Sequence, residues 1–198
     1  MQSHLLSPFV IFFASIFTSN ILLANFLGMC SFISVSKELK AAAGLGLAVT
    51  FVMTATNALN YLVYYYLLVP LGLEYLRFIA FIVVIAAFVQ LVEMVIDRVS
   101  PTLYYALGIF LPLITVNCAI FGANLFMLVR AYDFWRSVAY GAGSGLGWTL
   151  AILALAGIRR KIKPGVVPDA LFGPALAFVI TGIMAMAFTG FTGMIPIE

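Results

Sequence analysis

The sequence predicts an all-α integral membrane protein, a single membrane domain over residues 1–198 in which six transmembrane helices form two inverted three-helix repeats. Three observations lead to this prediction. Apolar residues make up 65% of the chain and charged residues only 9%, whereas soluble proteins average about 45–50% and 25%. Six apolar segments are long enough to cross a bilayer, and similar motifs recur at corresponding places in the two halves.

The six apolar segments follow one another with short connections between them. Each reaches the roughly 18–20 residues that a transmembrane helix needs. The segments lie near residues 5–35, 41–69, 77–96, 103–129, 134–157 and 171–191. The first has neither a basic flank nor a cleavage site after a short apolar core, so we do not expect a removable signal peptide. The short connections exclude a soluble domain that could bind NADH, a flavin dinucleotide or ATP, and we expect no nucleic-acid partner.

The distribution of basic residues predicts the orientation. If the N-terminus lies outside, seven basic residues fall on the inner face and three on the outer face, as cytoplasmic loops prefer. The inner set is Lys37, Lys40, Arg98, Arg159, Arg160, Lys161 and Lys163, and the outer set is Arg77, Arg130 and Arg136. Both termini are therefore expected outside the cytoplasmic membrane.

The two repeats are expected at approximately 5–97 and 103–193. The motif "GLGLAVT" at 44–50 matches "GSGLGWT" at 143–149 in four of seven positions. Because each repeat contains three crossings, the second enters the membrane from the opposite side, and such inverted repeats place their sites where broken helices meet near the midplane.

The first segment of each repeat is expected to be interrupted. Residues 5–35 as one helix would span about 46 Å, against a hydrocarbon core of about 30 Å. Residues that break helices or bond freed backbone groups gather in both segments: Ser19, Asn20, Asn25 and Gly28 in the first, and Pro112, Thr115, Asn117 and Gly122 in the second. Irregular backbone at membrane depth must be enclosed by protein or a cavity. We therefore predict breaks near 25–30 and 112–118 that face each other at mid-depth.

Cys30 and Cys118 are the only cysteines, one beside each predicted break. Composition alone favours buried packing, since a free cysteine behaves as a small apolar residue, and a disulfide is a lesser alternative. The symmetric placement favours metal ligation, because thiolates bind zinc, copper and iron–sulfur centres. Two thiolates complete no common four-ligand site, and His4 lies far away, so another chain would have to supply the remaining ligands.

Two other motifs favour structural roles. The glycines of "GAGSGLGW" at 141–148 form GxxxG pairs that allow close helix packing, and no strand is present to support a dinucleotide-binding site. Gln90, Glu93 and Asp97 share one helical face. For these acids, pairing with cytoplasmic basic residues is favoured over contact with a proton or cation in the membrane.

Several stretches closely resemble one family of membrane proteins. They are "ANFLGMCSF" at 24–32, "VQLVEM" at 89–94, "LGIFLPLITVNCAIFG" at 107–122 and "YGAGSGLGW" at 140–148. The family contains the E subunit of the bacterial sodium-translocating NADH:quinone oxidoreductase and its homologue, the A subunit of the Rnf ferredoxin:NAD complex. The resemblance covers residues 15–193. It leans toward the quinone reductase, with the Rnf complex as the near alternative.

The resemblance implies an electron relay in the bacterial inner membrane. Members of this family pair with a paralogous membrane protein, the D subunit, within a six-subunit complex, and each contributes two cysteines to a [2Fe–2S] cluster. Transferred to this chain, the ligands are Cys30 and Cys118, with Gly28 and Asn117 near the cluster sulfides. The flavins (FMN, FAD and riboflavin) are then bound by other subunits. Two rival functions remain open: a small inverted-repeat transporter or channel, and a structural anchor with dispensable thiols.

Overall fold

The computed structural model describes residues 7–99, 111–162 and 173–191, and the regular elements in these ranges are all helices. Within these ranges, four helical stretches are long and apolar enough to cross a membrane: Leu39–Leu68, Glu74–Val95, Pro112–Val129 (which includes the short interruption between α6 and α7) and Phe134–Lys161. Two shorter apolar helices, α1 (Pro8–Phe17) and α9 (Pro174–Thr189), stand near the chain ends. The all-helical membrane prediction is confirmed, while the count of six spans and the inverted repeats remain predictions.

The remaining elements follow the predicted segments closely. Helix α3 ends in a π-helical turn, η2, and a 3₁₀ turn, η3, leads into α4. The bounds are α2 (Met29–Val35), α3 (Leu39–Val63), η2 (Tyr64–Leu68), η3 (Glu74–Leu76), α4 (Arg77–Val99), α6 (Leu111–Thr115), α7 (Cys118–Val129) and α8 (Phe134–Lys161).

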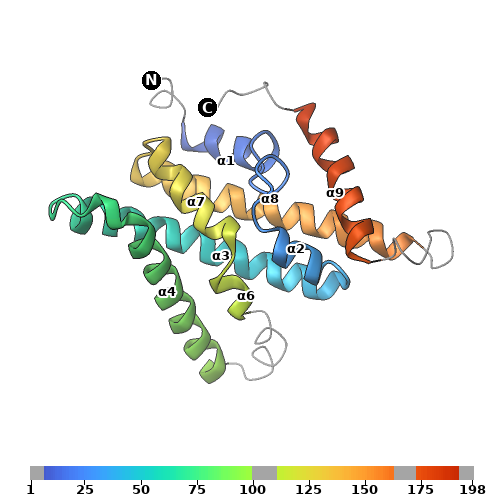
Figure 1. Cartoon of the computed structure of the whole chain (residues 1–198), viewed down its shortest axis with the longest axis horizontal. Coiled ribbons are helices and arrows are strands. Elements are labelled where there is room, and N and C mark those ends of the chain that lie inside the picture. The colour runs from blue at the N-terminus through green and yellow to red at the C-terminus, as the bar shows by residue number, and fades with distance from the viewer. Residues whose placement is uncertain (1–6, 100–110, 163–172, 192–198) are drawn as a thin grey trace.

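Helices α3 and α8 lie side by side through the centre of the molecule (Figure 1). They approach closely because a glycine on each helix faces a threonine on the other. A Cβ atom at Gly145 would lie 2.6 Å from the Thr50 Cα, and one at Gly46 would lie 2.5 Å from the Thr149 Cγ2. The two threonine hydroxyls are 3.0 Å apart. Helix α8 can therefore pack against α3 with backbone nearly touching backbone.

Helix α1 packs on a second glycine face of α8. Gly143 faces Ser15 and the Phe12 carbonyl, and a Cβ at Gly147 would lie 3.0 Å from the Ile16 carbonyl oxygen. Gly141 and Gly145 face α3, so the two GxxxG pairs serve two different neighbours. The prediction that these glycines act in helix packing is confirmed.

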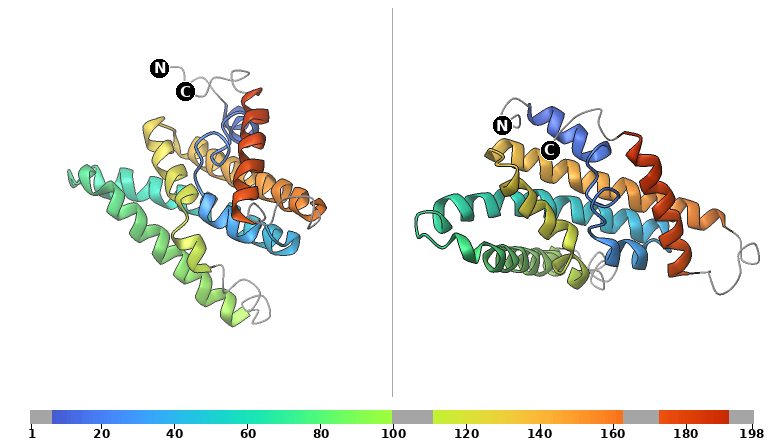
Figure 2. Two further views of the ribbon diagram at one scale, coloured as in Figure 1. Left: turned by 45° about the vertical axis from the view of Figure 1, so that its right-hand side comes forward. Right: turned by 45° about the horizontal axis from the view of Figure 1, so that its top comes forward.

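The interior of the bundle is mainly apolar but includes buried polar side chains, and exposed apolar side chains cover its outside. Within it, Asn60 Nδ2 donates to Asn124 Oδ1 at 2.8 Å, and Asn124 Nδ2 donates to the Ile120 carbonyl at 2.7 Å. The first of these bonds joins α3 to α7, as side-chain amides commonly do between transmembrane helices. Helix α4 diverges from the bundle (Figures 1 and 2). Its exposed apolar side chains include Ile79, Ile82, Val83, Leu91 and Met94.

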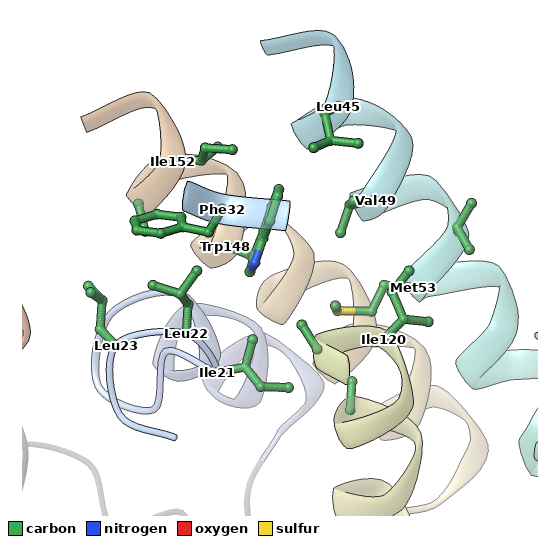
Figure 3. Packing of buried hydrophobic residues seen from close by; sticks show 14 of the residues in the cluster. Ile21, Leu22, Leu23, Phe32, Leu45, Val49, Met53, Ile120, Trp148 and Ile152 are labelled. Carbon is green, nitrogen blue, oxygen red and sulfur yellow. The ribbon is translucent and has the colours of Figure 1, made fainter. Parts of the chain in front are cut away.

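The core extends from α3 and α8 to the loop after α1. Figure 3 shows Ile21, Leu22 and Leu23 of this loop gathered with Phe32 of α2 and Trp148 of α8. All five are at most 3% exposed. The irregular loop is thus a packed part of the core, held in one place relative to α8.

Candidate metal centre

The first break is a compact loop between α1 and α2. Asn20 builds it: its Oδ1 accepts the backbone N–H groups of Leu22 and Leu23 at 3.0 and 3.3 Å. Its Nδ2 donates to the Ile16 carbonyl at 3.0 Å, which is freed where α1 ends. One side chain therefore satisfies backbone groups on both sides of the break, as asparagine does in turns.

The second break is only two residues long, between the end of α6 and the start of α7. Asn117 Oδ1 accepts the Ala119 N–H at 3.0 Å and caps α7. Its Nδ2 donates to Ser31 Oγ in α2 at 3.2 Å. A single asparagine thus terminates one break and ties it to the helix that follows the other.

The two breaks meet directly at Gly28 and Cys118. The Gly28 backbone N–H donates to Cys118 Sγ at 2.9 Å. Gly28 has a left-handed backbone with φ of 86°. A Cβ there would lie 2.6 Å from Trp148 Nε1 and 2.9 Å from the Ala119 Cβ. Glycine is therefore required both by the backbone conformation and by the space, and its absent side chain lets the amide reach the sulfur.

Both thiols lie on the outside of this contact. Cys30 and Cys118 are free and exposed, so neither thiol is packed in the core of this chain. Cys118 stands at the first position of α7, where the helix dipole favours negative charge. Phe26 and Val116, one from each break, are 55% and 72% exposed. We call these four exposed residues, two beside each break, the break surface (Phe26, Cys30, Val116, Cys118).

The donor set of this chain is incomplete for a metal ion. Within the described ranges no three His, Cys, Asp or Glu side chains gather as ligands, and His4 lies outside those ranges. The two exposed thiols and the N–H···S contact fit an iron–sulfur group that receives further ligands from another chain.

The acidic residues of α4 lie in a different segment of the chain from the residues of the break surface. Glu93 is half-buried and Gln90 exposed. The side chain of Asp97 lies outside the described residues, so the proposed pairing of these acids stays a prediction.

Sequence reasoning missed Ser31, which binds Asn117, and Trp148, which closes the space behind Gly28. The repeated motif at 44–50 and 143–149 indicated a packing role for the glycines around Trp148 but no role for its indole ring. Only the fold shows that the ring reaches the first break.

Comparison with known proteins places the chain in a family. The model of the Rnf-Nqr subunit membrane proteins matches residues 8–195. The chain belongs to the Rnf-Nqr family of membrane proteins. It is 53% identical to the E subunit of the Na⁺-translocating NADH-quinone reductase of Proteus mirabilis, over 98% of this chain and 99% of that protein.

A relative from the second complex is similar to nearly the same degree. The chain is 50% identical to the A subunit of the Na⁺-translocating ferredoxin:NAD⁺ oxidoreductase complex of Acetobacterium woodii, over 93% of this chain and 96% of that protein. The E subunit of the Serratia proteamaculans reductase is 52% identical, over 98% and 99%. The relatives are oxidoreductase subunits, which confirms the predicted family. Their identities do not separate the two complexes.

Proposed function

We propose that this Rnf-Nqr protein supplies two of the four thiolate ligands of an intramembrane [2Fe–2S] cluster, Cys30 and Cys118. The observation that carries the proposal is the 2.9 Å contact from the Gly28 N–H to Cys118 Sγ, which joins both breaks beside exposed thiols. Hydrogen bonds from backbone amides to cluster-ligating sulfur are one of the means by which proteins tune iron–sulfur centres. The bound cluster supplies one-electron transfer between the two sides of the membrane.

The other two ligands come from a partner that covers the break surface. Exposed irregular backbone is not left facing lipid, and Phe26 and Val116 offer apolar area beside the thiols. A paralogous D subunit, with its own two cysteines, satisfies the ligand count. The full assembly is then a sodium-translocating NADH:quinone reductase or an Rnf ferredoxin:NAD complex, in which other subunits carry the flavins.

The chain's own residues have distinct tasks in this proposal. Gly28 keeps the amide close to Cys118 and donates a hydrogen bond that stabilises negative charge on the sulfur. Asn117 holds the second break and, through Ser31, fixes it relative to α2. Trp148 fills the space behind Gly28, so the loop cannot retreat from the sulfur.

The inverted repeats and the membrane orientation are part of the same proposal. The reciprocal contacts of Gly46 with Thr149 and of Gly145 with Thr50 support a two-fold relation between the halves. The basic residues of the loops support an orientation with both termini outside, and the bacterial inner membrane is the location that the family resemblance implies.

The test replaces each ligand by serine, Cys30→Ser and Cys118→Ser, in the assembled complex. Serine keeps the size but loses the soft thiolate that iron favours. We expect loss of the intramembrane iron–sulfur signal and of end-to-end electron transfer. Reduction of artificial acceptors on the cytoplasmic side should persist, because that reaction uses other chains.

The matched control is Ser34→Ala, on the exposed side of α2 one turn after Cys30, which should retain both activities. Full iron content and full turnover in Cys118→Ala would refute the ligand role. Ion flux through the purified chain alone, without electron donors, would instead support the transporter alternative.

A further inference from the structure

Helix α2 and the glycine before it contact one face of α8. At one end of this contact Trp148 fills the space behind Gly28, where an added Cβ would lie 2.6 Å from the indole Nε1. Arg159 follows eleven residues later, which is about three helical turns, so it lies on the same face of α8. Figure 3 places Phe32 of α2 near Ile152 of α8, and both side chains are fully buried. One face of α8 therefore supports the segment from Gly28 through α2.

Arg159 holds the last turn of α2. Its Nη1 group, which carries two hydrogens, donates to Ser36 Oγ at 2.7 Å and to the Ile33 carbonyl oxygen at 3.3 Å. The last carbonyl groups of a helix lack partners within the helix, and hydrogen bonds from a charged donor are stronger than those between neutral groups. Arg159 is half-buried, whereas its neighbour Arg160 is exposed. The first of the two arginines thus turns toward α2.

The first turn of α2 is held by the second break. Ser31 Oγ accepts a hydrogen bond from Asn117 Nδ2 at 3.2 Å and donates to the Gly28 carbonyl at 3.2 Å. A helix of seven residues is not stable by itself, so its position depends on its contacts with the rest of the chain. The Ser31 contact fixes the start of the helix but leaves its tilt and its rotation free. The Arg159 contact at the other end removes that freedom.

Cys30 lies in the first turn of α2, close to Cys118. The Gly28 N–H is 2.9 Å from Cys118 Sγ, and Cys30 follows Gly28 by two residues. Because consecutive Cα atoms are about 3.8 Å apart, the Cys30 Cα lies no more than about 12 Å from that sulfur. The Cys30 thiol is exposed, so its direction changes when α2 rotates or tilts.

We propose that Arg159 is a positioning residue for Cys30. By holding the last turn of α2 against α8, it fixes the direction of the Cys30 thiol relative to Cys118. Groups that do not themselves bind a metal commonly orient the ligands that do. The purpose of this arrangement rests on the proposed function, in which both thiolates bind one cluster. The geometry belongs to this chain alone and is tested without the cluster.

The first measurement is hydrogen exchange of the α2 backbone amides in the purified full chain. Arg159→Gln should accelerate this exchange by about tenfold or more, because hydrogen bonds to charged groups contribute more to stability than neutral ones. Arg159→Lys keeps the charge without the planar fork of donors and should recover part of the protection. Arg160→Gln removes the neighbouring exposed charge and should leave the exchange unchanged.

Arg130→Gln is a second control. Arg130 donates from Nη2 to Ser19 Oγ at 3.3 Å, and its guanidinium carbon lies 5.3 Å from the ring centre of Tyr140. It therefore holds the beginning of the first break rather than α2. This variant should accelerate exchange near Ser19 and leave the exchange of α2 unchanged.

The second measurement reports the spacing of the thiols. Cys30 and Cys118 are the only cysteines of the chain and both are exposed, so a nitroxide label on each gives dipolar broadening of the electron paramagnetic resonance spectrum. Arg159→Gln should lose part of the broadening seen in the wild-type chain, and the milder Ser36→Ala should lose less. The double variant should add little to Arg159→Gln alone, because the two residues share one hydrogen bond.

Wild-type exchange and wild-type broadening in both Arg159→Gln and Ser36→Ala overturn the inference and leave the proposed function intact. Faster exchange with unchanged broadening also overturns it, because Arg159 would then stabilise α2 without directing the thiol. If Arg159→Gln does not fold, the Ser36→Ala measurements decide. A wild-type complex without an intramembrane cluster signal overturns the proposed function instead, and the two measurements on α2 stand apart from that result.

Discussion

Replacing Gly28 by alanine tests the contact between the two breaks most directly. The left-handed backbone, with φ of 86°, costs a residue with a Cβ about 1–2 kcal/mol. The new Cβ would also lie 2.6 Å from Trp148 Nε1 and 2.9 Å from the Ala119 Cβ. Such overpacking typically costs about 1–3 kcal/mol. Together, these two costs predict that Gly28→Ala lowers the free energy of unfolding by about 2–5 kcal/mol.

The chain offers two matched controls for this substitution. Gly72 also has a positive φ, 66°, but a Cβ there meets nothing within 4 Å, so Gly72→Ala should show the backbone cost alone. Gly182 lies in α9 with neither constraint, and Gly182→Ala should be neutral or stabilising because alanine favours helix. The midpoint of thermal unfolding in detergent should therefore be highest for Gly182→Ala, lower for Gly72→Ala and lowest for Gly28→Ala.

A second substitution identifies the clash itself. Trp148→Phe removes the indole nitrogen nearest to the new Cβ and should restore part of the stability of Gly28→Ala. Equal unfolding midpoints for Gly28→Ala and Gly72→Ala would show that the space behind Gly28 is not tight. In that case the account of how the amide reaches Cys118 fails.

Two further predictions concern the bundle and the outer turn. Gly145→Val should prevent assembly of the bundle, because the new side chain meets the Thr50 backbone. The control Gly157→Val should assemble normally, because no atom lies within 4 Å of a Cβ at that position. The yield of folded protein in detergent distinguishes the two variants. Burial raises the pKa of Tyr132, in the turn between α7 and α8, above its ordinary value of 10.0 against the opposing effect of Arg130. The folded state therefore holds this proton more tightly, so the contribution of Tyr132 to stability should be constant below about pH 10 and fall above it, and Tyr132→Phe should reduce that fall in the thermal midpoint.

The breaks show where sequence reasoning succeeds. Polar and helix-breaking residues predict both, and both occur beside a cysteine. The second lies at Val116–Asn117 rather than at Pro112, because Pro112 falls in the first turn of α6, where proline is tolerated. The first extends over residues 18–28, longer than predicted, because Asn20 ends α1 early and Ile21–Leu23 then gain burial in the core.

Contacts between residues that are far apart in the chain could not be predicted from the sequence. Spacing can place Gly28 and Cys118 beside separate breaks, but only the packing of α7 and α8 brings the amide to the sulfur. Counting loop charges assigns Arg130 and Arg159 to opposite faces as topological signals. It says nothing about side chains that turn inward, since an arginine can reach either water or the bundle with little change in backbone position.

The two glycine faces of α8 also bear on how the chain is made. Helices α1 and α3 both build their tightest contacts on α8, which is synthesised roughly 70 residues after the end of α3. Until α8 inserts, the first three helical segments lack the surface that orders them, so the early membrane intermediate must remain loosely associated. Separately expressed halves, divided between α4 and α6, should then be short-lived alone and become protease-resistant only when produced together.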